Sequence, residues 1–231
     1  MNKYAIIVAG GLGTRLQADR PKQFLEIANK PILIHTLFRF LQAVPDIKKI
    51  VVVTHLDWME YTQQIIQRHV ANFECIEVIA GGKTRFESVR NGLKHLSSLP
   101  NGYVAVHDAV RCCIKIQDIR QAFEVAQQKN NCVVCTTLKE SIRKIVSSGT
   151  EAVPRDKYLV VQTPQIFLLQ DMLNVYLQQI EIEPQYITDD ASLMEQYGHQ
   201  IFTILIADHN IKITTPQDLY LAEYLLRNSC S

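Results

Sequence analysis

The chain has 231 residues, of which 47% are hydrophobic and 20% charged, and its formal net charge is +1. This composition suits one α/β domain over residues 1–231, and it excludes a broad basic field for nucleic acid or for an anionic membrane. No apolar run is long enough to predict a transmembrane helix. The N-terminus leads directly into an apolar run without the layout of a signal peptide, so we expect a cytoplasmic protein.

The first predicted element is a buried strand from Tyr4 to Ala9, and a glycine-rich turn follows it at once. Two cations, Arg15 and Lys22, come after the glycines. Glycine lets backbone N–H groups approach an anion without a Cβ in the way, and Arg and Lys supply charge that glycine lacks. We therefore expect a polyphosphate cradle formed by Ala9, Gly10, Gly11, Leu12, Gly13 and Thr14.

Three sequence motifs compete for this turn. The dinucleotide fingerprint needs a small third residue, but Leu16 stands at that position, and the P-loop pattern is absent. The nucleotidyltransferase signature, G-G-x-G-T/S-R followed by P-K, matches at every position. A glycine-rich turn without a ligand is disfavoured by the two cations.

Strands and helices then alternate as far as residue 136. Val- and Ile-rich runs predict the strands, and helical spacing of apolar residues predicts the helices. Asp57 is expected to cap one helix, and Thr84 with Glu87 is expected to form a capping box on another. This alternation predicts a Rossmann-like α/β fold with a mainly parallel sheet and ligands at its carboxyl edge. We expect strands at 24–27, 49–54, 75–79, 103–106 and 131–136, and helices at 31–42, 58–69, 84–96, 117–128.

The pattern changes after residue 136. Two short strands, 139–146 and 151–154, form an excursion with too few large apolar residues for a core of its own. We expect this arm, at about 138–157, to pack on a partner subunit. The remaining expected elements are a strand at 158–162, a turn at 163–165, helices at 168–177, 188–197 and from 215 onward, and strands at 201–205 and 210–213.

The six cysteines do not indicate a disulfide framework in a chain of this size without a signal peptide. Cys132 and Cys135 have the spacing of a redox or metal pair, but they lie in an apolar strand where residues three apart point to opposite faces. We expect a pair of buried small hydrophobic residues. Cys75, Cys112, Cys113 and Cys230 carry no such spacing, although Cys112 and Cys113 lie beside the candidate site.

Six motifs in the same order identify a family. They are A-G-G-x-G-T-R with P-K-Q-F, G-G-x-x-R-x-x-S-V, H-D-A-x-R, P-R with T-P-Q-x-F, T-D-D-A-S, and N-I-K-I-T-T-P-x-D-L. With these motifs the chain resembles 2-C-methyl-D-erythritol 4-phosphate cytidylyltransferases over nearly its whole length. The resemblance implies transfer of the CMP unit of CTP to a sugar-alcohol phosphate, release of pyrophosphate, and a place in isoprenoid biosynthesis.

The resemblance also implies roles for the cations and for the glycine loop. Arg15 and Lys22 would hold the triphosphate and stabilise the transition state, and the Gly10–Gly13 backbone would bind the β- and γ-phosphates. Lys212 and Arg155 match the substrate-positioning cations of the family. The reaction itself asks for positioning and charge, not for a general base, because a phosphate monoester has a second pKa of about 6.

Asp108 directly follows a predicted strand, in the segment His107–Arg111. A carboxylate that faces polyphosphate at such a place favours Mg²⁺, which keeps most of its waters and needs only one protein carboxylate. An aspartate that only caps a loop is the alternative. Arg111 is expected to contact the sugar phosphate or to orient Asp108, and His107 to be structural.

The remaining expected contacts fall into two groups. Gly82, Arg85 and Ser88 match the base-reading segment of the family, although Arg85 could equally be a surface cation of its helix. Thr163 and Thr188 are candidate hydroxyl donors to the second substrate, and Ser141 supplies the hydroxyl of the arm motif. The resemblance implies a homodimer in which the arm brings Arg155 to the neighbouring site.

Two segments depart from the family pattern. Lys139-Glu140-Ser141 stands where R-D-T is common, and the longer Glu140 could alter the substrate fit. Val110 and Cys112 replace Ala and Pro in H-D-A-A-R-P, which removes a φ constraint after Arg111. Cys112 is then either a reactive, partly exposed thiol or an inert filler, and the filler is favoured.

Three other functions stay open. Ribitol-5-phosphate cytidylyltransferases share most of these motifs, and the H-D-A-V-R loop favours them while T-D-D-A-S favours the methylerythritol branch. A Rossmann oxidoreductase would bind NAD(P), but Leu16 counts against it. A nucleotide sensor without catalysis is disfavoured by the intact set of Arg15, Lys22, Asp108, Arg155 and Lys212.

Overall fold

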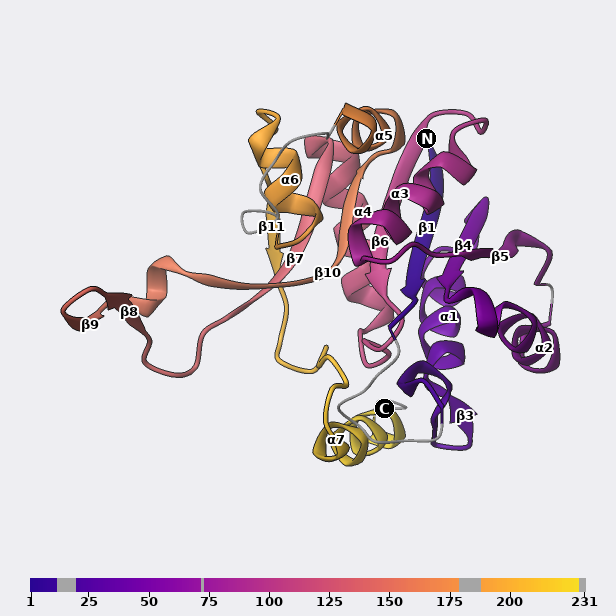
Figure 1. Ribbon diagram of the computed structural model, residues 1–231, viewed down its shortest axis with the longest axis horizontal. Helices are drawn as coiled ribbons and strands as arrows, with labels where there is room; N and C mark the ends of the chain where they lie inside the picture. Colours follow the sequence, from indigo (N-terminus) through magenta and orange to yellow (C-terminus); the bar gives the residue numbers. More distant parts are fainter. Residues whose placement is uncertain (12–19, 72, 179–187, 229–231) are drawn as a thin grey trace.

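The computed structural model describes residues 1–11, 20–71, 73–178 and 188–228. Its centre is a seven-stranded sheet with the strand order β11-β7-β10-β6-β1-β4-β5 (Figure 1). Every neighbouring pair is parallel except the two that β10 makes with β6 and β7. The expected mainly parallel α/β sheet is therefore confirmed. The strands are β1 (Asn2–Ala9), β4 (Lys49–Thr54), β5 (Ile76–Ala80), β6 (Gly102–Asp108), β7 (Asn131–Thr137), β10 (Leu159–Leu168) and β11 (Thr203–Leu205).

Both faces of this sheet are buried, which explains why its strands are continuous apolar runs. In β1, Ile7 belongs to one hydrophobic core and Tyr4 and Ile6 to the other. In β7 the same alternation separates Cys132 from Cys135. The two cysteines are therefore buried on opposite faces, as predicted, and burial raises the pKa of Cys132 to about 12.

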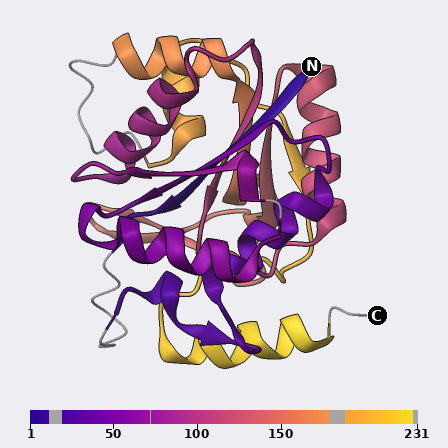
Figure 2. The same ribbon diagram turned by 90° about the vertical axis from the view of Figure 1, so that its right-hand side faces the viewer.

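Helices cover the two faces in groups of three. The first core receives α1 (Ile32–Ala43), α2 (Met59–His69) and α4 (Ile116–Lys129). The second receives α3 (Arg85–Leu96), α5 (Leu169–Gln178) and α6 (Asp190–Gln196). Figure 2 shows the twisted sheet between these layers. In the described part of the chain no helix is long and apolar enough to cross a membrane.

A third, smaller core lies below the carboxyl edge of the sheet, where α7 (Pro216–Asn228) packs. It joins Ile213, next to the predicted Lys212, to Val110, in the loop after β6. The N–H of Ile213 donates to the carbonyl of Val110 at 3.1 Å. This small core also contains Ile27 of β2 (Glu26–Ile27), which pairs with β3 (Lys30–Pro31) in a two-stranded sheet. It therefore holds together loops that carry expected site residues.

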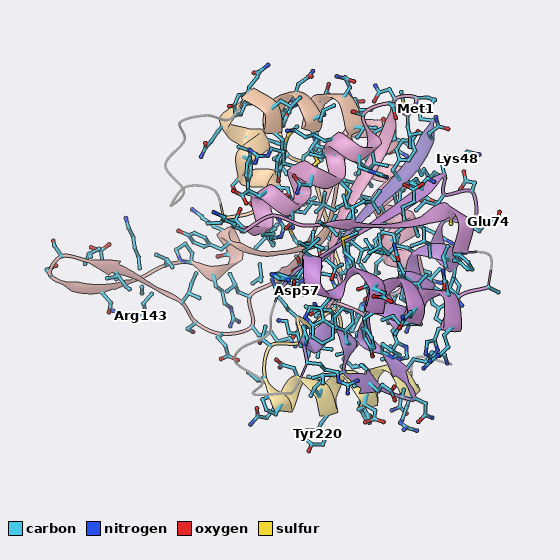
Figure 3. The ribbon with its side chains drawn as sticks, turned by 45° about the vertical axis from the view of Figure 1, so that its right-hand side comes forward. Met1, Lys48, Asp57, Glu74, Arg143 and Tyr220 are labelled. Atoms are coloured by element: carbon cyan, nitrogen blue, oxygen red, sulfur yellow. The ribbon has the colours of Figure 1, made fainter. Side chains whose placement is uncertain are left out.

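The predicted arm is a hairpin of β8 (Arg143–Val146) and β9 (Gly149–Ala152). In Figure 1 it extends far from the body of the molecule, and Figure 3 shows Arg143 on it. Its side chains are exposed except for the half-buried Val146, and Ile145 is 86% exposed. The hairpin has no core of its own, so its shape agrees with the sequence-based expectation.

Four local predictions were wrong. Residues 163–165 do not form a turn: they continue β10, whose pairing register shifts between Val161 and Gln165. Pro164 sits in this irregular stretch because a proline cannot donate to the ladder. Asn210–Ile213 is not a strand. The expected strand at 24–27 begins too early: Phe24 ends a 3-10 helix, Lys22–Phe24, and only Glu26–Ile27 form the strand β2. Another 3-10 helix, Leu56–Trp58, precedes α2, so Asp57 does not cap α2.

Candidate active site

The candidate site lies where the parallel strands end, at the carboxyl edge of the sheet. Asp108 is the last residue of β6, and its Cα is paired with that of Val8 in β1. β1 runs into Gly10 and Gly11, and α3 begins soon after β5. Strand ends of one direction meet at one edge, so Asp108 faces the glycine segment and the start of α3 together.

Three cations surround the buried carboxylate of Asp108. Lys212 Nζ lies 2.9 Å from Oδ2, Arg85 Nε lies 3.4 Å from Oδ1, and Arg111 Nε lies 3.5 Å from Oδ2. Burial raises the pKa of Asp108, but these neighbouring charges outweigh it and hold the pKa well below its usual range. The carboxylate is therefore ionised at neutral pH, and its single negative charge faces three positive charges.

A cavity of about 300 Å³ opens beside the glycine segment, and we call it the glycine-loop cavity. Its described lining combines backbone-rich turns with cations, which suits a polyanion. Lys22 enters it from the 3-10 helix, and its Nζ donates to the carbonyl of Ile213 at 2.9 Å. The expected site residues in its lining are Ala9, Gly10, Gly11, Lys22, Gly82, Arg85, Ser88, Asp108 and Lys212.

The turn before α3 is held by side chains of α3 itself. Ser88 Oγ accepts from the N–H of Gly82 at 3.1 Å and donates to the carbonyl of Thr84 at 2.9 Å. A Cβ on Gly82 would lie 2.2 Å from Cβ of Glu87, so only glycine fits there. The capping box is half formed: Thr84 accepts from the N–H of Glu87, while the Glu87 carboxylate accepts from the N–H of Lys83 instead.

A second cavity, of about 580 Å³, lies on the other side of Asp108 between β7, β10 and α6, and we call it the α6 cavity. Asp189 caps α6 with a full capping box, accepting from the N–H of Ser192 at 2.9 Å. The expected second-substrate residues Arg111, Thr163 and Thr188 line this cavity. Arg85, Asp108 and Lys212 line both cavities, so these three residues form the boundary between them.

His107 and Thr163 fix the loop after β6 through a directed set of hydrogen bonds. The hydroxyl of Thr163 accepts from the N–H of Asp108 at 3.1 Å, so its proton is free to donate to Nδ1 of His107, also at 3.1 Å. The imidazole then carries its own proton on Nε2 and donates to the carbonyl of Arg111 at 3.2 Å. Burial lowers the pKa of His107 to about 4. The neutral imidazole is structural, in agreement with the expectation.

The structure places the remaining predicted residues as follows. Leu12, Gly13, Thr14 and Arg15 lie outside the described residues. Arg155 and Ser141 belong to the exposed base of the arm, and neither lines either cavity. Arg155 donates from Nη1 to the carbonyl of Lys139. Their expected roles remain predictions.

Cys112 is fully buried in the small core, and its Sγ lies 4.0 Å from that of Cys113. The hydrogen bond with the Cys113 thiol and burial raise the pKa of Cys112 well above its usual value. It is therefore the inert filler, and the alternative of an exposed, reactive thiol is wrong.

A divalent metal fits this site only when the nucleotide brings most of its ligands. In the described stretches no group of three or more His, Cys, Asp or Glu side chains is arranged to hold a metal ion. Asp108 is the single carboxylate common to the two cavities, and Lys212 already contacts its Oδ2. One carboxylate suffices for Mg²⁺ that is bound mainly by phosphate oxygens and water.

The structure adds residues that the motif analysis did not assign to the site. Asp190 binds Arg85 through both carboxylate oxygens, at 3.0 and 2.8 Å, and Tyr176 donates to it from α5. Asn210 donates to the side chain of Gln162 at 2.8 Å and to the carbonyl of Thr163 at 2.9 Å. The T-D-D-A-S motif signalled Asp190, but no pattern signals Tyr176, which reads as an ordinary apolar position of α5.

Comparisons with known proteins point to one family. The family model described as 2-C-methyl-D-erythritol 4-phosphate cytidylyltransferase matches residues 4–228. A protein of that name from Porphyromonas gingivalis is 42% identical over 226 residues, covering 97% of both chains, and one from Bacteroides thetaiotaomicron is 38% identical, covering 98% of this chain and 100% of its own. The crystal structure of the Francisella tularensis protein of that name is 29% identical, with a TM-score of 0.77 and coverage of 97% and 100%.

Proposed function

The chain belongs to the 2-C-methyl-D-erythritol 4-phosphate cytidylyltransferase family, and we propose that its two adjoining cavities receive the two substrates of that reaction. The enzyme transfers the CMP unit of CTP to 2-C-methyl-D-erythritol 4-phosphate. The products are 4-(cytidine 5′-diphospho)-2-C-methyl-D-erythritol and pyrophosphate, and the reaction belongs to the non-mevalonate route of isoprenoid biosynthesis. CTP occupies the glycine-loop cavity, and the sugar phosphate occupies the α6 cavity.

One observation carries this assignment: Arg85, Asp108 and Lys212 line both cavities. A nucleotide whose base lies near Gly82 and whose phosphates lie near Lys22 would bring its α-phosphate to this boundary. The phosphate of the second substrate reaches the same boundary from the α6 cavity. The two reacting phosphates therefore meet beside Lys212, which is the arrangement that a direct displacement requires.

The mechanism needs charge stabilisation more than proton transfer. A phosphate oxygen of the sugar phosphate attacks the α-phosphorus of CTP, a new P–O–P bond forms, and the bond to the β-phosphate oxygen breaks as pyrophosphate leaves. The attacking phosphate is largely dianionic at neutral pH, because its second pKa is about 6. Lys22 and Lys212, together with Arg15 as expected from the sequence, neutralise the negative charge that gathers on the oxygens around phosphorus.

Asp108 orients the cations of the boundary. Its carboxylate holds Lys212 at 2.9 Å and faces Arg85 and Arg111, so that these long side chains are fixed before substrates arrive. Arg111 is further held by a hydrogen bond of 2.8 Å to the carbonyl of Asn210. In our proposal Arg111, Thr163 and Thr188 bind the sugar phosphate, while Gly82, Arg85 and Ser88 support the nucleotide and its base.

Asp108 is also the residue that would hold Mg²⁺ brought by the triphosphate. The metal would neutralise the negative charge of the phosphate oxygens and favour release of pyrophosphate. Lys212 contacts the same carboxylate and keeps an exposed side chain, so it would remain accessible to a phosphate while Asp108 held the metal.

We further propose a homodimer in which the arm of each subunit completes the site of the other. The first residues of β10 border the α6 cavity and carry exposed apolar side chains, Leu159 at 41% and Val161 at 44%. Such a run at the base of an exposed hairpin suits burial against a second copy. In that dimer Arg155 and Ser141 of the arm act in the neighbouring α6 cavity. A single domain over residues 1–231 and a cytoplasmic location remain predictions from the sequence.

The choice between sugar phosphates is tested by pyrophosphate release from CTP. With Mg²⁺ present, we expect release with 2-C-methyl-D-erythritol 4-phosphate and little with ribitol 5-phosphate. Strong release with ribitol 5-phosphate alone would assign the enzyme to the ribitol branch. A thermal shift with CTP and Mg²⁺ but none with NAD(P) excludes the oxidoreductase, and CTP binding without release from either sugar phosphate would support a nucleotide sensor.

A further inference from the structure

Tyr176 is a buried tyrosine of α5 whose hydroxyl has an ionic partner. The residue is 2% exposed, and its hydroxyl donates to Oδ1 of Asp190. Its ring is fixed by a stacked contact with Phe86 of α3, with ring centroids 4.6 Å apart and an interplanar angle of 9°. Burial and the carboxylate raise the pKa of Tyr176 well above its usual value, so the hydroxyl keeps its proton and always donates.

Asp190 also binds Arg85 and so connects Tyr176 to it. Its carboxylate is fully buried, and it binds the guanidinium with two hydrogen bonds, Nη1 to Oδ1 at 3.0 Å and Nη2 to Oδ2 at 2.8 Å. The same Oδ1 therefore accepts from both Tyr176 and Arg85. A bidentate pair of this kind fixes the plane of the guanidinium as well as its position.

The orientation of the guanidinium plane then determines which atom of Arg85 faces the site. With Nη1 and Nη2 engaged by Asp190, Nε is the atom that faces Asp108, at 3.4 Å from Oδ1. A series of side-chain contacts thus leads from α5 through α6 and α3 to the end of β6, by way of Tyr176, Asp190, Arg85 and Asp108. It ends at the boundary of the two cavities, where Arg85 and Asp108 line both.

We propose that Tyr176 is a positioning residue for nucleotidyl transfer, acting through Asp190 and Arg85 on the Asp108 cluster. This proposal rests on the proposed function, because the reacting phosphates must meet at that boundary. Without the hydroxyl, Oδ1 of Asp190 loses one of its two donors, and the carboxylate can rotate about its χ2 angle. The guanidinium then loses its fixed plane, and Arg85 no longer holds Asp108 in one orientation.

The test is the single-atom change Tyr176→Phe, with Tyr4→Phe as the matched control. Tyr4 belongs to the same hydrophobic core, is 1% exposed, and donates its hydroxyl to the carbonyl of Pro100 at 2.7 Å, away from both cavities. Pyrophosphate release is measured for both variants at varied CTP and sugar phosphate, together with the melting temperature. Each variant should lose some stability from one missing buried hydrogen bond.

We expect the two variants to differ in kcat. Tyr176→Phe should lower kcat about three- to tenfold while KM for each substrate changes less than twofold, because positioning at the boundary acts on the transition state. Tyr4→Phe should keep kcat within twofold of wild type. Equal kcat values for Tyr176→Phe and Tyr4→Phe would overturn the proposal, since any effect would then come from stability alone.

A double-mutant cycle with Arg85→Lys tests whether Tyr176 acts through Arg85. Lysine keeps the charge but cannot form the bidentate pair, so Tyr176→Phe should have little further effect on kcat in that background. Fully additive losses would overturn the path through Arg85. If Tyr176→Phe does not fold, the kcat of Arg85→Lys carries the test: a lower kcat at an unchanged melting temperature supports the path through the bidentate Arg85–Asp190 pair, and a wild-type kcat overturns it. Wild-type enzyme that releases pyrophosphate with neither sugar phosphate contradicts the proposed function itself, whereas an active wild type with a fully active Tyr176→Phe contradicts only this inference.

Discussion

Lys212 Nζ lies 2.9 Å from Oδ2 of Asp108, and this pair stands at the boundary of two cavities that approach it from opposite sides. The residues come from distant parts of the chain, the end of β6 and the segment after β11. The small core brings them together through Val110 and Ile213, whose backbones share a hydrogen bond. The pair therefore links the fold directly to the chemistry that we propose.

Lys22→Ala should reduce turnover more than tenfold while the affinity for CTP falls less. Lys22 lines the glycine-loop cavity, and its charge is needed most when negative charge gathers on the phosphate oxygens in the transition state. Single-turnover pyrophosphate release and calorimetric CTP binding measure the two effects separately. A loss of binding in proportion to the loss of rate would contradict a transition-state role.

Arg155→Ala should remain dimeric and lose activity, because Arg155 is proposed to act in the neighbouring site. Mixing it with an inactive Lys212→Gln variant offers a sharper test. If subunits exchange at random, about half of the dimers are mixed, and in each mixed dimer one of the two sites carries neither change. Activity should therefore return to about a quarter of wild type. Gel filtration controls for assembly. No recovery from a verified mixed dimer would show that Arg155 and Lys212 serve the same subunit.

His107 should make stability depend on pH between about 4 and 6.5. Its pKa is lowered to about 4 by burial, so the unfolded chain binds a proton that the folded chain refuses, and stability falls as pH drops through this window. At pH 5 the loss is about 2 kcal/mol relative to neutral pH. Urea unfolding of wild type and His107→Gln at pH 7 and 5 measures it. The variant should show a shallower pH dependence, and identical slopes would contradict the neutral, buried imidazole.

The buried thiols should resist modification in the native protein. Cys112, Cys113, Cys132 and Cys135 are each at most 3% exposed, and burial raises the pKa of Cys135 to about 11. Burial makes all four thiols inaccessible, and the raised pKa of Cys112, Cys132 and Cys135 also makes the reactive thiolate scarce at those three positions. Titration with an aromatic disulfide reagent should label these four only after denaturant is added. Fast native labelling at Cys112, located by mass spectrometry, would contradict its assignment as an inert filler.

Much of the fold could be predicted because local and long-range signals agree there. β4 and the helices α1, α3 and α4 begin and end within one or two residues of the prediction, since apolar periodicity and burial give the same answer. The prediction of a turn at 163–165 was wrong. Thr-Pro-Gln is locally a turn sequence, but pairing with β7 and β6 continues the strand around it. Tertiary pairing overrode local preference.

The site could be predicted in part, for a similar reason. Lys22, Asp108 and Lys212 carry charges inside recognisable motifs, and the structure brings all three to one cavity. Tyr176 could not be predicted, because a tyrosine on the apolar face of a helix looks like a core residue until its hydroxyl partner is seen. The sequence alone could not decide whether Arg85 belongs to the site or is a surface cation of its helix. The structure decides this, because the guanidinium is bound to Asp190.

The most direct test of the two-cavity account measures KM for both substrates in Ser88→Ala and Thr188→Val. Ser88 lines only the glycine-loop cavity, and Thr188 lines only the α6 cavity. From steady-state pyrophosphate release, Ser88→Ala should raise KM for CTP about three- to tenfold and leave KM for 2-C-methyl-D-erythritol 4-phosphate within twofold, while Thr188→Val should do the reverse. If either variant raises KM for the opposite substrate instead, CTP and the sugar phosphate do not occupy the cavities that we assign to them.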